Sequence, residues 1–258
     1  MKKLHAVLII SAIFFACREP GQLAINVNFG TIEIERNNAD LSTDTSIRYH
    51  VSIKYLSPAD APAGLRDSIM KFTVSFFSAW FPSDVADFDL NTAVKEDMIK
   101  FLSASDAVKS EGDYLGDRCF DLRVEAETPY QNKALISLIY SWSLYEGGAH
   151  GNHAKYCINI SKTSGERITY SHLIKDEAAL LSVAELWFRN MHGMNSDEEM
   201  YRIYDFGKGR FRLSENFALT VNGLTFYYNP YEIAPYSAGQ IQFTVPYSEL
   251  RDCINFLD

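Results

Sequence analysis

The stretch ALISLIYSWSLY, Ala134–Tyr145, decides the fold of this chain. Its even-numbered positions are all apolar, whereas Ser137, Ser141 and Ser143 occupy odd-numbered positions. Because successive side chains of a β-strand point to opposite faces of a sheet, this alternation predicts one long strand. We expect one face of the strand to lie in a core and the other to be half exposed or shallowly covered.

Alternating segments flank this run on both sides. Residues 120–124 alternate apolar and charged side chains, and residues 129–132 are typical of the turn between two strands. Residues 156–160 predict a third strand, which Ser164-Gly165 would end with a turn. These segments together predict an antiparallel meander.

A hairpin is predicted nearer the C-terminus. Apolar residues alternate on both sides of Asn222-Gly223, and this dipeptide is typical of a type I′ turn, so we expect a hairpin over residues 217–228. Residues 241–245 predict a last strand.

Four segments have apolar residues at helical spacing. They cover residues 65–79, 89–103 and 176–191, and a short segment that begins at Ser248. The polar residues 194–210 predict a mobile loop. Helices among antiparallel strands indicate the α+β class, with antiparallel β-sheet meanders and amphipathic helices packed on one face.

The N-terminus is typical of a lipoprotein signal peptide, residues 1–16. Lys2 and Lys3 precede an apolar run of about a dozen residues, which is shorter than the roughly 20 residues of a spanning helix. Cleavage would leave Cys17 as an acylated N-terminal residue that anchors the protein in a membrane. The alternative is an ordinary secretory signal followed by a chance cysteine.

The rest of the chain divides into a tether and a folded body. Residues 17–46 predict the tether, with one early strand at Ile32 and Ile34. The length of the body, residues 47–258, fits one large domain or two small ones. Arg18 is not the Asp that retains some lipoproteins at the inner membrane, which favours the outer membrane.

The chain is acidic, with 33 acidic and 24 basic residues and a net charge of −9. Removal of residues 1–16 takes away two lysines and no acid, so the mature chain carries 22 basic residues and a net charge of −11. This balance argues against nucleic acid as a partner. It favours a cationic partner, or it serves solubility alone.

Three cysteines remain beyond Cys17: Cys119, Cys157 and Cys253. No pair has zinc-binding spacing, so we expect no metal and no other cofactor. One disulfide with undetermined partners is compatible with an oxidising compartment. Buried free thiols are the alternative that we favour.

Two polar segments could carry a site. Residues 146–153 (EGGAHGNH) include Gly147, Gly148 and His150, and residues 229–239 (NPYEIAPYSAG) include Tyr231, Glu232 and Tyr236. The glycines allow positive φ and close backbone approach, and the tyrosines could line a pocket for a sugar or a peptide. Both segments could equally be shaped turns whose side chains only pack.

Neither segment contains a catalytic motif. The chain has no G-x-S-x-G elbow, P-loop or G-x-G-x-x-G motif, so we predict a protein that is not an enzyme. The rival hypothesis is an envelope hydrolase that uses Glu146, His150 or Glu232 in a cleft between the two segments. We expect His150 and Glu232 to lie close together and to brace the two loops.

Three motifs in this order resemble the RsiV-like domain of unknown function: GGAH (147–150), FYYNPYEIAPYSAG (226–239) and VPYSEL (245–250). The resemblance covers residues 130–256, and residues 47–115 more faintly resemble the PdaC/RsiV-type domain that usually precedes it. It implies an N-terminal α+β region over residues 47–129 and an RsiV-like domain over residues 130–258. The family includes the exported part of an anti-sigma factor that binds lysozyme, a region beside a peptidoglycan deacetylase domain, and many bacterial lipoproteins.

The resemblance implies an α+β fold and a role in the cell envelope. The chain lacks a sigma-factor-binding segment and the metal-binding motifs of the deacetylase domain, so neither of those activities is implied. We therefore expect a non-enzymatic envelope lipoprotein, facing the periplasm or the cell surface, that recognises a lysozyme-like protein or a peptidoglycan fragment.

Overall fold

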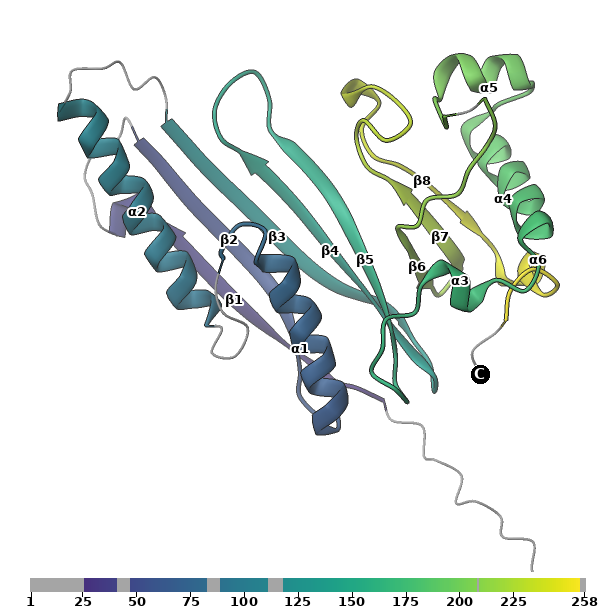
Figure 1. The fold of residues 1–258 in the computed structure, drawn as a ribbon, viewed down its shortest axis with the longest axis horizontal. Coiled ribbons are helices and arrows are strands. Elements are labelled where there is room, and N and C mark those ends of the chain that lie inside the picture. Colours follow the sequence, from purple (N-terminus) through teal and green to yellow (C-terminus); the bar gives the residue numbers. More distant parts are fainter. Residues whose placement is uncertain (1–25, 41–46, 83–88, 111–117, 208, 256–258) are drawn as a thin grey trace, which may run out of the picture.

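The computed structural model describes residues 26–40, 47–82, 89–110, 118–207 and 209–255. In these ranges a five-stranded and a three-stranded β-sheet combine with helices (Figure 1). The fold is α+β, with sheets that are largely antiparallel, as the sequence predicts.

The larger sheet has the strand order β1-β2-β3-β4-β5. Its neighbours are antiparallel except for β2 and β3, which are parallel. A parallel pair needs a long crossover connection, and the chain makes it through two helices. The strands are β1 Phe29–Asn37, β2 Ile47–Pro58, β3 Arg118–Gln131, β4 Leu135–Tyr145 and β5 Asn152–Ser161, and the helices are α1 Ala63–Phe77 and α2 Leu90–Ser110.

Helices α1 and α2 cover one face of this sheet (Figure 1). Tyr49 and Val51 of β2 are fully buried in the core under them, with Tyr140 of β4 and Phe77 of α1. The Tyr49 hydroxyl donates a hydrogen bond of 2.9 Å to the carboxylate of Asp97 on α2. The even-numbered side chains of β4 therefore face this core, which confirms the alternation of residues 134–145.

The smaller sheet, β6-β7-β8, packs against helix α4. Asp176 caps the first turn of α4 by accepting the Ala179 N–H, and Gly193 ends the helix at φ 67°. Phe188 of α4 is fully buried against Phe243 of β8. The elements of this part are α3 Tyr170–Leu173, α4 Glu177–His192, α5 Asp197–Ile203, β6 Phe217–Thr220, β7 Gly223–Tyr228, β8 Ile241–Val245 and α6 Tyr247–Leu250. The described residues also form the 3₁₀-helices η1 Asn38–Asp40 and η3 Tyr236–Ala238.

Buried polar side chains join the two sheets. The Ser137 hydroxyl of β4 donates to Asn159 Oδ1 of β5 at 2.6 Å and accepts the Leu219 N–H of β6 at 3.1 Å. Asn159 Nδ2 in turn donates to the Phe217 carbonyl at 2.9 Å. Strand β6 therefore covers one end of the polar face of β4.

Two asparagines close the outer edge of β5. Asn216 accepts the Cys157 N–H at 2.8 Å and donates to the Lys155 carbonyl at 2.9 Å. Asn229 accepts the Lys155 N–H at 2.9 Å and donates to the same carbonyl at 3.0 Å. These side chains take the place of a sixth strand, because an edge strand otherwise leaves its backbone groups unpaired.

Several sequence predictions are confirmed. The predicted helices 65–79, 89–103 and 176–191 correspond to α1, α2 and α4, and the early strand at Ile32 and Ile34 is β1. Helix α6 starts within one residue of Ser248.

The turn predicted at residues 129–132 is misplaced. Strand β3 continues through Pro129 to Gln131, with an irregular register between Glu127 and Tyr130. Proline has no N–H to donate, so it is tolerated where the ladder is interrupted. The turn follows at Asn132, whose side chain accepts the backbone N–H groups of Ala134 and Leu135.

The hairpin over residues 217–228 is confirmed, but its predicted turn type is wrong. Thr220 pairs with Gly223, so Val221 and Asn222 form the centre of the turn. A type I′ turn needs positive φ at both central residues, and Tyr231 is the single non-glycine residue with positive φ in the described ranges. Gly223 instead belongs to β7, where a Cβ atom would lie 2.1 Å from the Val245 carbonyl oxygen.

The loop predicted over residues 194–210 contains a helix, α5. Ser196 caps it by accepting the Glu199 N–H at 3.1 Å, and Met200 anchors it in the core with no exposed surface. Strand β2 has no counterpart among the sequence predictions.

The predicted signal peptide, residues 1–16, and Cys17 lie outside the described residues. In the ranges that are described, no helix is both long and apolar enough to cross a membrane. Cys119, Cys157 and Cys253 are buried free thiols.

Candidate functional site

The loop between β4 and β5 is shaped by glycines. Gly147 and Gly148 have φ values of 95° and 93°, a region that other residues rarely adopt. The Tyr145 hydroxyl donates to the Gly148 carbonyl at 2.9 Å, which closes the loop on itself. A Cβ atom on Gly151 would lie 2.8 Å from the Leu144 carbonyl oxygen, so the chain can return to β5 only through glycine.

The segment that joins β7 to β8 holds Tyr231 in an unusual backbone conformation. Tyr231 has a φ of 71° and 64% of its surface is exposed. Its N–H donates to the Ala234 carbonyl at 3.2 Å, and the Glu232 N–H donates to the Asn229 carbonyl at 3.1 Å. A large residue held at positive φ stores strain, and such positions concentrate at ligand-binding sites.

The two loops meet at Tyr236. Its hydroxyl donates a hydrogen bond of 2.6 Å to the Gly151 carbonyl. Its ring stacks on His150 with the centroids 4.1 Å apart, and lies 5.7 Å from both Tyr231 and His153. We call these four side chains, His150, His153, Tyr231 and Tyr236, the aromatic cluster.

Glu232 does not take the predicted position beside His150. The Glu232 carbonyl accepts a long hydrogen bond of 3.5 Å from Arg212. Glu232 also lines a hollow of about 320 Å³ beside α5. Desolvation in this hollow raises the pKa of the Glu232 carboxyl group. The prediction that His150 contacts Glu232 and so braces the two loops is therefore wrong. The residue that contacts His150 from the second loop is Tyr236.

A groove lies on the face of the larger sheet that points away from α1 and α2. Strand β6 covers one end of this face, and the groove occupies the uncovered end. Two cross-strand rows of side chains line it. The first row is Ser52, Arg123, Ser143 and His153, and the second is Lys54, Glu125, Ser141 and Lys155. The groove has a volume of about 430 Å³, and Gln240, just before β8, also lines it. We call it the sheet groove.

Small side chains on the central strand explain why this face is hollow. Ser141 and Ser143 project from β4, between longer side chains on β3 and on β5. His153 lines the groove and also contacts Tyr236, so the sheet groove continues into the aromatic cluster.

The three cationic side chains of the groove have defined partners. Lys54 pairs with Glu33 of β1 at 3.3 Å, and Lys155 places its ammonium group 5.2 Å from the centre of the Tyr227 ring. Arg123 pairs through Nε with Asp121 at 3.3 Å.

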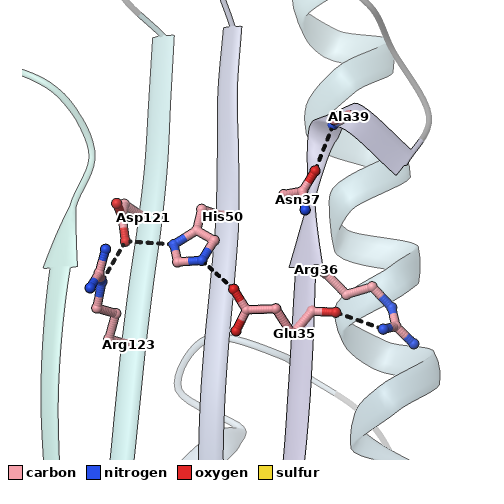
Figure 2. A network of polar contacts seen from close by, with 7 residues as sticks. All are labelled: Glu35, Arg36, Asn37, Ala39, His50, Asp121 and Arg123. Atoms are coloured by element: carbon pink, nitrogen blue, oxygen red, sulfur yellow. Dashed lines mark hydrogen bonds and ion pairs between the residues drawn. The ribbon is translucent and has the colours of Figure 1, made fainter.

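Asp121 connects the groove to a polar network across three strands (Figure 2). His50 of β2 lies between Asp121 on β3 and Glu35 on β1, with nitrogen–oxygen distances of 3.1 and 2.6 Å. Partial burial lowers the pKa of His50, but its hydrogen bonds with the two carboxylates outweigh burial, so its pKa is raised. Hydrogen bonds from Ser52 and His50 lower the pKa of Glu35. Partial burial acts to raise the pKa of Asp121, but hydrogen bonds from His50 and Arg123 lower it overall.

The structure brings together part of the predicted site. Gly147, Gly148, His150, Tyr231 and Tyr236 belong to two loops in contact. The sequence prediction included His153 in the segment 146–153 but missed Lys155 on β5 and the groove residues on β2 and β3. Ser141 and Ser143 were a usable signal, because small polar residues on an otherwise apolar strand indicate a face that the core does not fill.

Comparison with known families gives one match. Residues 172–248 match a family described as proteins of unknown function, DUF3298. The matched region runs from α3 to the beginning of α6 and contains the loop of Tyr231 and Tyr236. No curated protein matches the chain.

Solved structures share the whole fold. A crystal structure of a DUF3298 family member from Bacteroides fragilis is similar, with a TM-score of 0.72 and 20% sequence identity, over 90% of this chain and 94% of that one. A DUF3298 family protein from Pseudomonas aeruginosa has a TM-score of 0.62 and 19% identity, over 91% of this chain and 97% of that one. Both sheets therefore belong to one recurring architecture.

Proposed function

We propose that this protein is a non-enzymatic envelope lipoprotein that recognises a peptidoglycan fragment. In this proposal the RsiV-like C-terminal region carries the aromatic cluster, and an acylated Cys17 holds the protein at the outer membrane. The observation that carries the proposal is the aromatic cluster, which opens directly into the sheet groove.

The chemistry of the two parts suits a glycan with a peptide attached. Exposed aromatic rings offer flat apolar surfaces with a polar hydroxyl, and Tyr231 is held outward by its strained backbone. The groove beside them offers serine hydroxyls and charged side chains, which suit amides and carboxylates.

The arrangement favours binding over hydrolysis. A hydrolase of the alternative kind would need Glu146, His150 or Glu232 to converge on a single cleft. His150 stacks on Tyr236, whereas Glu232 lines the separate hollow beside α5.

A lysozyme-like protein is the second candidate ligand. It is favoured by the net charge of −9, because a basic protein would be attracted to an acidic surface. That attraction is not directed to one site, so we rank the wall fragment first.

Calorimetric titration tests the proposal. The chain from residue 17, with Cys17→Ser to prevent acylation, would be titrated with soluble peptidoglycan fragments and with lysozyme. Loss of one stacking partner in Tyr231→Ala or His150→Ala should weaken fragment binding about tenfold. Val221→Ala, at an exposed apolar residue of the β6–β7 turn, is the control and should bind as the wild type does.

Two results would change the conclusion. The absence of saturable heat with any wall fragment would refute the proposed ligand. Saturable binding to lysozyme alone, weakened by the same two substitutions, would make the second candidate the function.

A further inference from the structure

We infer that the sheet groove binds carboxylate groups of an acidic peptide, with Arg123 and Lys155 as the residues that hold them. The inference rests on the proposed function and names the part of the wall fragment that the groove would take. The aromatic cluster would take the sugar, and the groove the peptide that extends from it.

The lining of the groove is richer in cations than the chain as a whole. Three cationic side chains line it, Lys54, Arg123 and Lys155, against one carboxylate, Glu125. The chain as a whole carries 33 acidic and 24 basic residues. Glu33 and Asp121, outside the lining, pair with Lys54 and Arg123, so a ligand carboxylate would share these two cations with them. A cluster of cations in an acidic protein still marks one place that attracts an anionic ligand.

Arg123 is placed to hold a carboxylate with two hydrogen bonds. Its side chain is 64% exposed and its ion pair with Asp121 uses Nε. The Glu35 carboxylate also acts on the guanidinium group electrostatically, but among the contacts of the described residues no hydrogen bond engages the two terminal nitrogens of Arg123. Two parallel N–H groups match the geometry of a carboxylate.

Lys155 is fixed more firmly than a surface lysine. Asn216 and Asn229 hold both of its backbone groups, and the Tyr227 ring lies under its ammonium group. Side chains that are already ordered lose little entropy when a ligand binds, so this arrangement favours affinity. Ser141 lies opposite Lys155 in the strand register, where its hydroxyl can bond to the peptide amides between two carboxylates.

The test compares three ligands on one protein. The Cys17→Ser chain would be titrated with a disaccharide-peptide that has free carboxylates, with the same compound after amidation, and with a neutral N-acetylglucosamine oligomer. The wild type should bind the free acid about tenfold or more tightly than its amide. Arg123→Gln with Lys155→Gln should remove that difference and leave affinity for the amide unchanged.

A matched control separates the effect of removing the groove cations from the effect of lowering the net charge. Lys71→Gln with Lys95→Gln removes two exposed cations from α1 and α2, on the opposite face of the sheet. This variant should keep the tenfold preference. Equal losses in the two double variants, or no loss in the groove variant, would overturn the inference.

The outcomes also separate the inference from the proposed function. Equal binding of acid and amide, with both weakened by Tyr231→Ala, would leave the proposed function standing and refute the role of the groove. No binding of any of the three compounds would refute both. Thermal melts of all variants would show that each protein tested is folded.

Discussion

Ser137 and Ser141 lie on the same strand and the same sheet face, four residues apart, yet their surroundings differ completely. Ser137 has no exposed surface and bonds to Asn159 and to the backbone of Leu219. Ser141 lines the open sheet groove. The difference comes from the second sheet, because β6 covers one end of this face and leaves the other open. One alternating pattern thus produces an interface and a site.

The largest expected difference in stability comes from replacing each of the two serines by leucine. Ser137→Leu should destabilise the fold by about 4 kcal/mol, because it overpacks a closed interface and leaves Asn159 and the Leu219 N–H without their partner. Ser141→Leu should change stability by less than about 0.5 kcal/mol. Urea unfolding of the two variants measures the contrast.

Ligand binding should be affected by Ser141→Leu, the variant that changes stability less. The leucine at position 141 would occupy the floor of the groove and should abolish the preference for free carboxylates. If Ser141→Leu is as destabilising as Ser137→Leu, the open half of the face is part of the core and the groove is not a binding site.

A smaller effect should separate the two edges of the large sheet. Asn216→Ala should cost about 2 kcal/mol, because it leaves the buried Cys157 N–H unpaired. Thr31→Ala on the opposite edge strand, where the side chain is exposed, should cost less than about 0.5 kcal/mol. Denaturant midpoints give both values, and equal costs would show that the asparagine does not close the edge.

The helices and strands whose apolar residues recur at a regular spacing could be predicted from the sequence. The two-residue alternation of β4 and the helical spacing of α4, with Asp176 and Gly193 at its ends, are local signals. Strand β2 carries an equally clear alternation, Ile47, Tyr49, Val51 and Ile53, and could have been predicted from the same rule.

The site could be predicted only in part, for a physical reason. The aromatic cluster joins residues about 80 positions apart, and its two loops could be singled out because glycines and tyrosines are unusual there. The groove depends on the register of four strands, which places Arg123 opposite Ser143 and Lys155 opposite Ser141. Register follows from the whole sheet, so no single segment reveals it.

The smallest expected effect concerns the polar network at the other edge of the groove. The raised pKa of His50 means that its protonated form stabilises the folded state. That contribution is complete below the unfolded-state pKa of about 6.5 and is lost as the pH rises through the folded-state pKa. The lowered pKa values of Glu35 and Asp121 act in the other direction, since their contribution is present above about pH 4 and is lost as the pH falls.

The network is therefore most stabilising between about pH 4.5 and 6.5. We expect His50→Asn to cost about 0.5 kcal/mol in this window, and less on either side, since the Glu35 side chain is 60% exposed and its interaction with His50 is screened by solvent. Urea unfolding at pH 5.5 and pH 8 measures the difference. A cost that is larger at pH 8 would mean that His50 stabilises the sheet through neutral hydrogen bonds. In that case the protonated histidine would have no part in balancing Asp121, and Arg123 alone would neutralise that carboxylate.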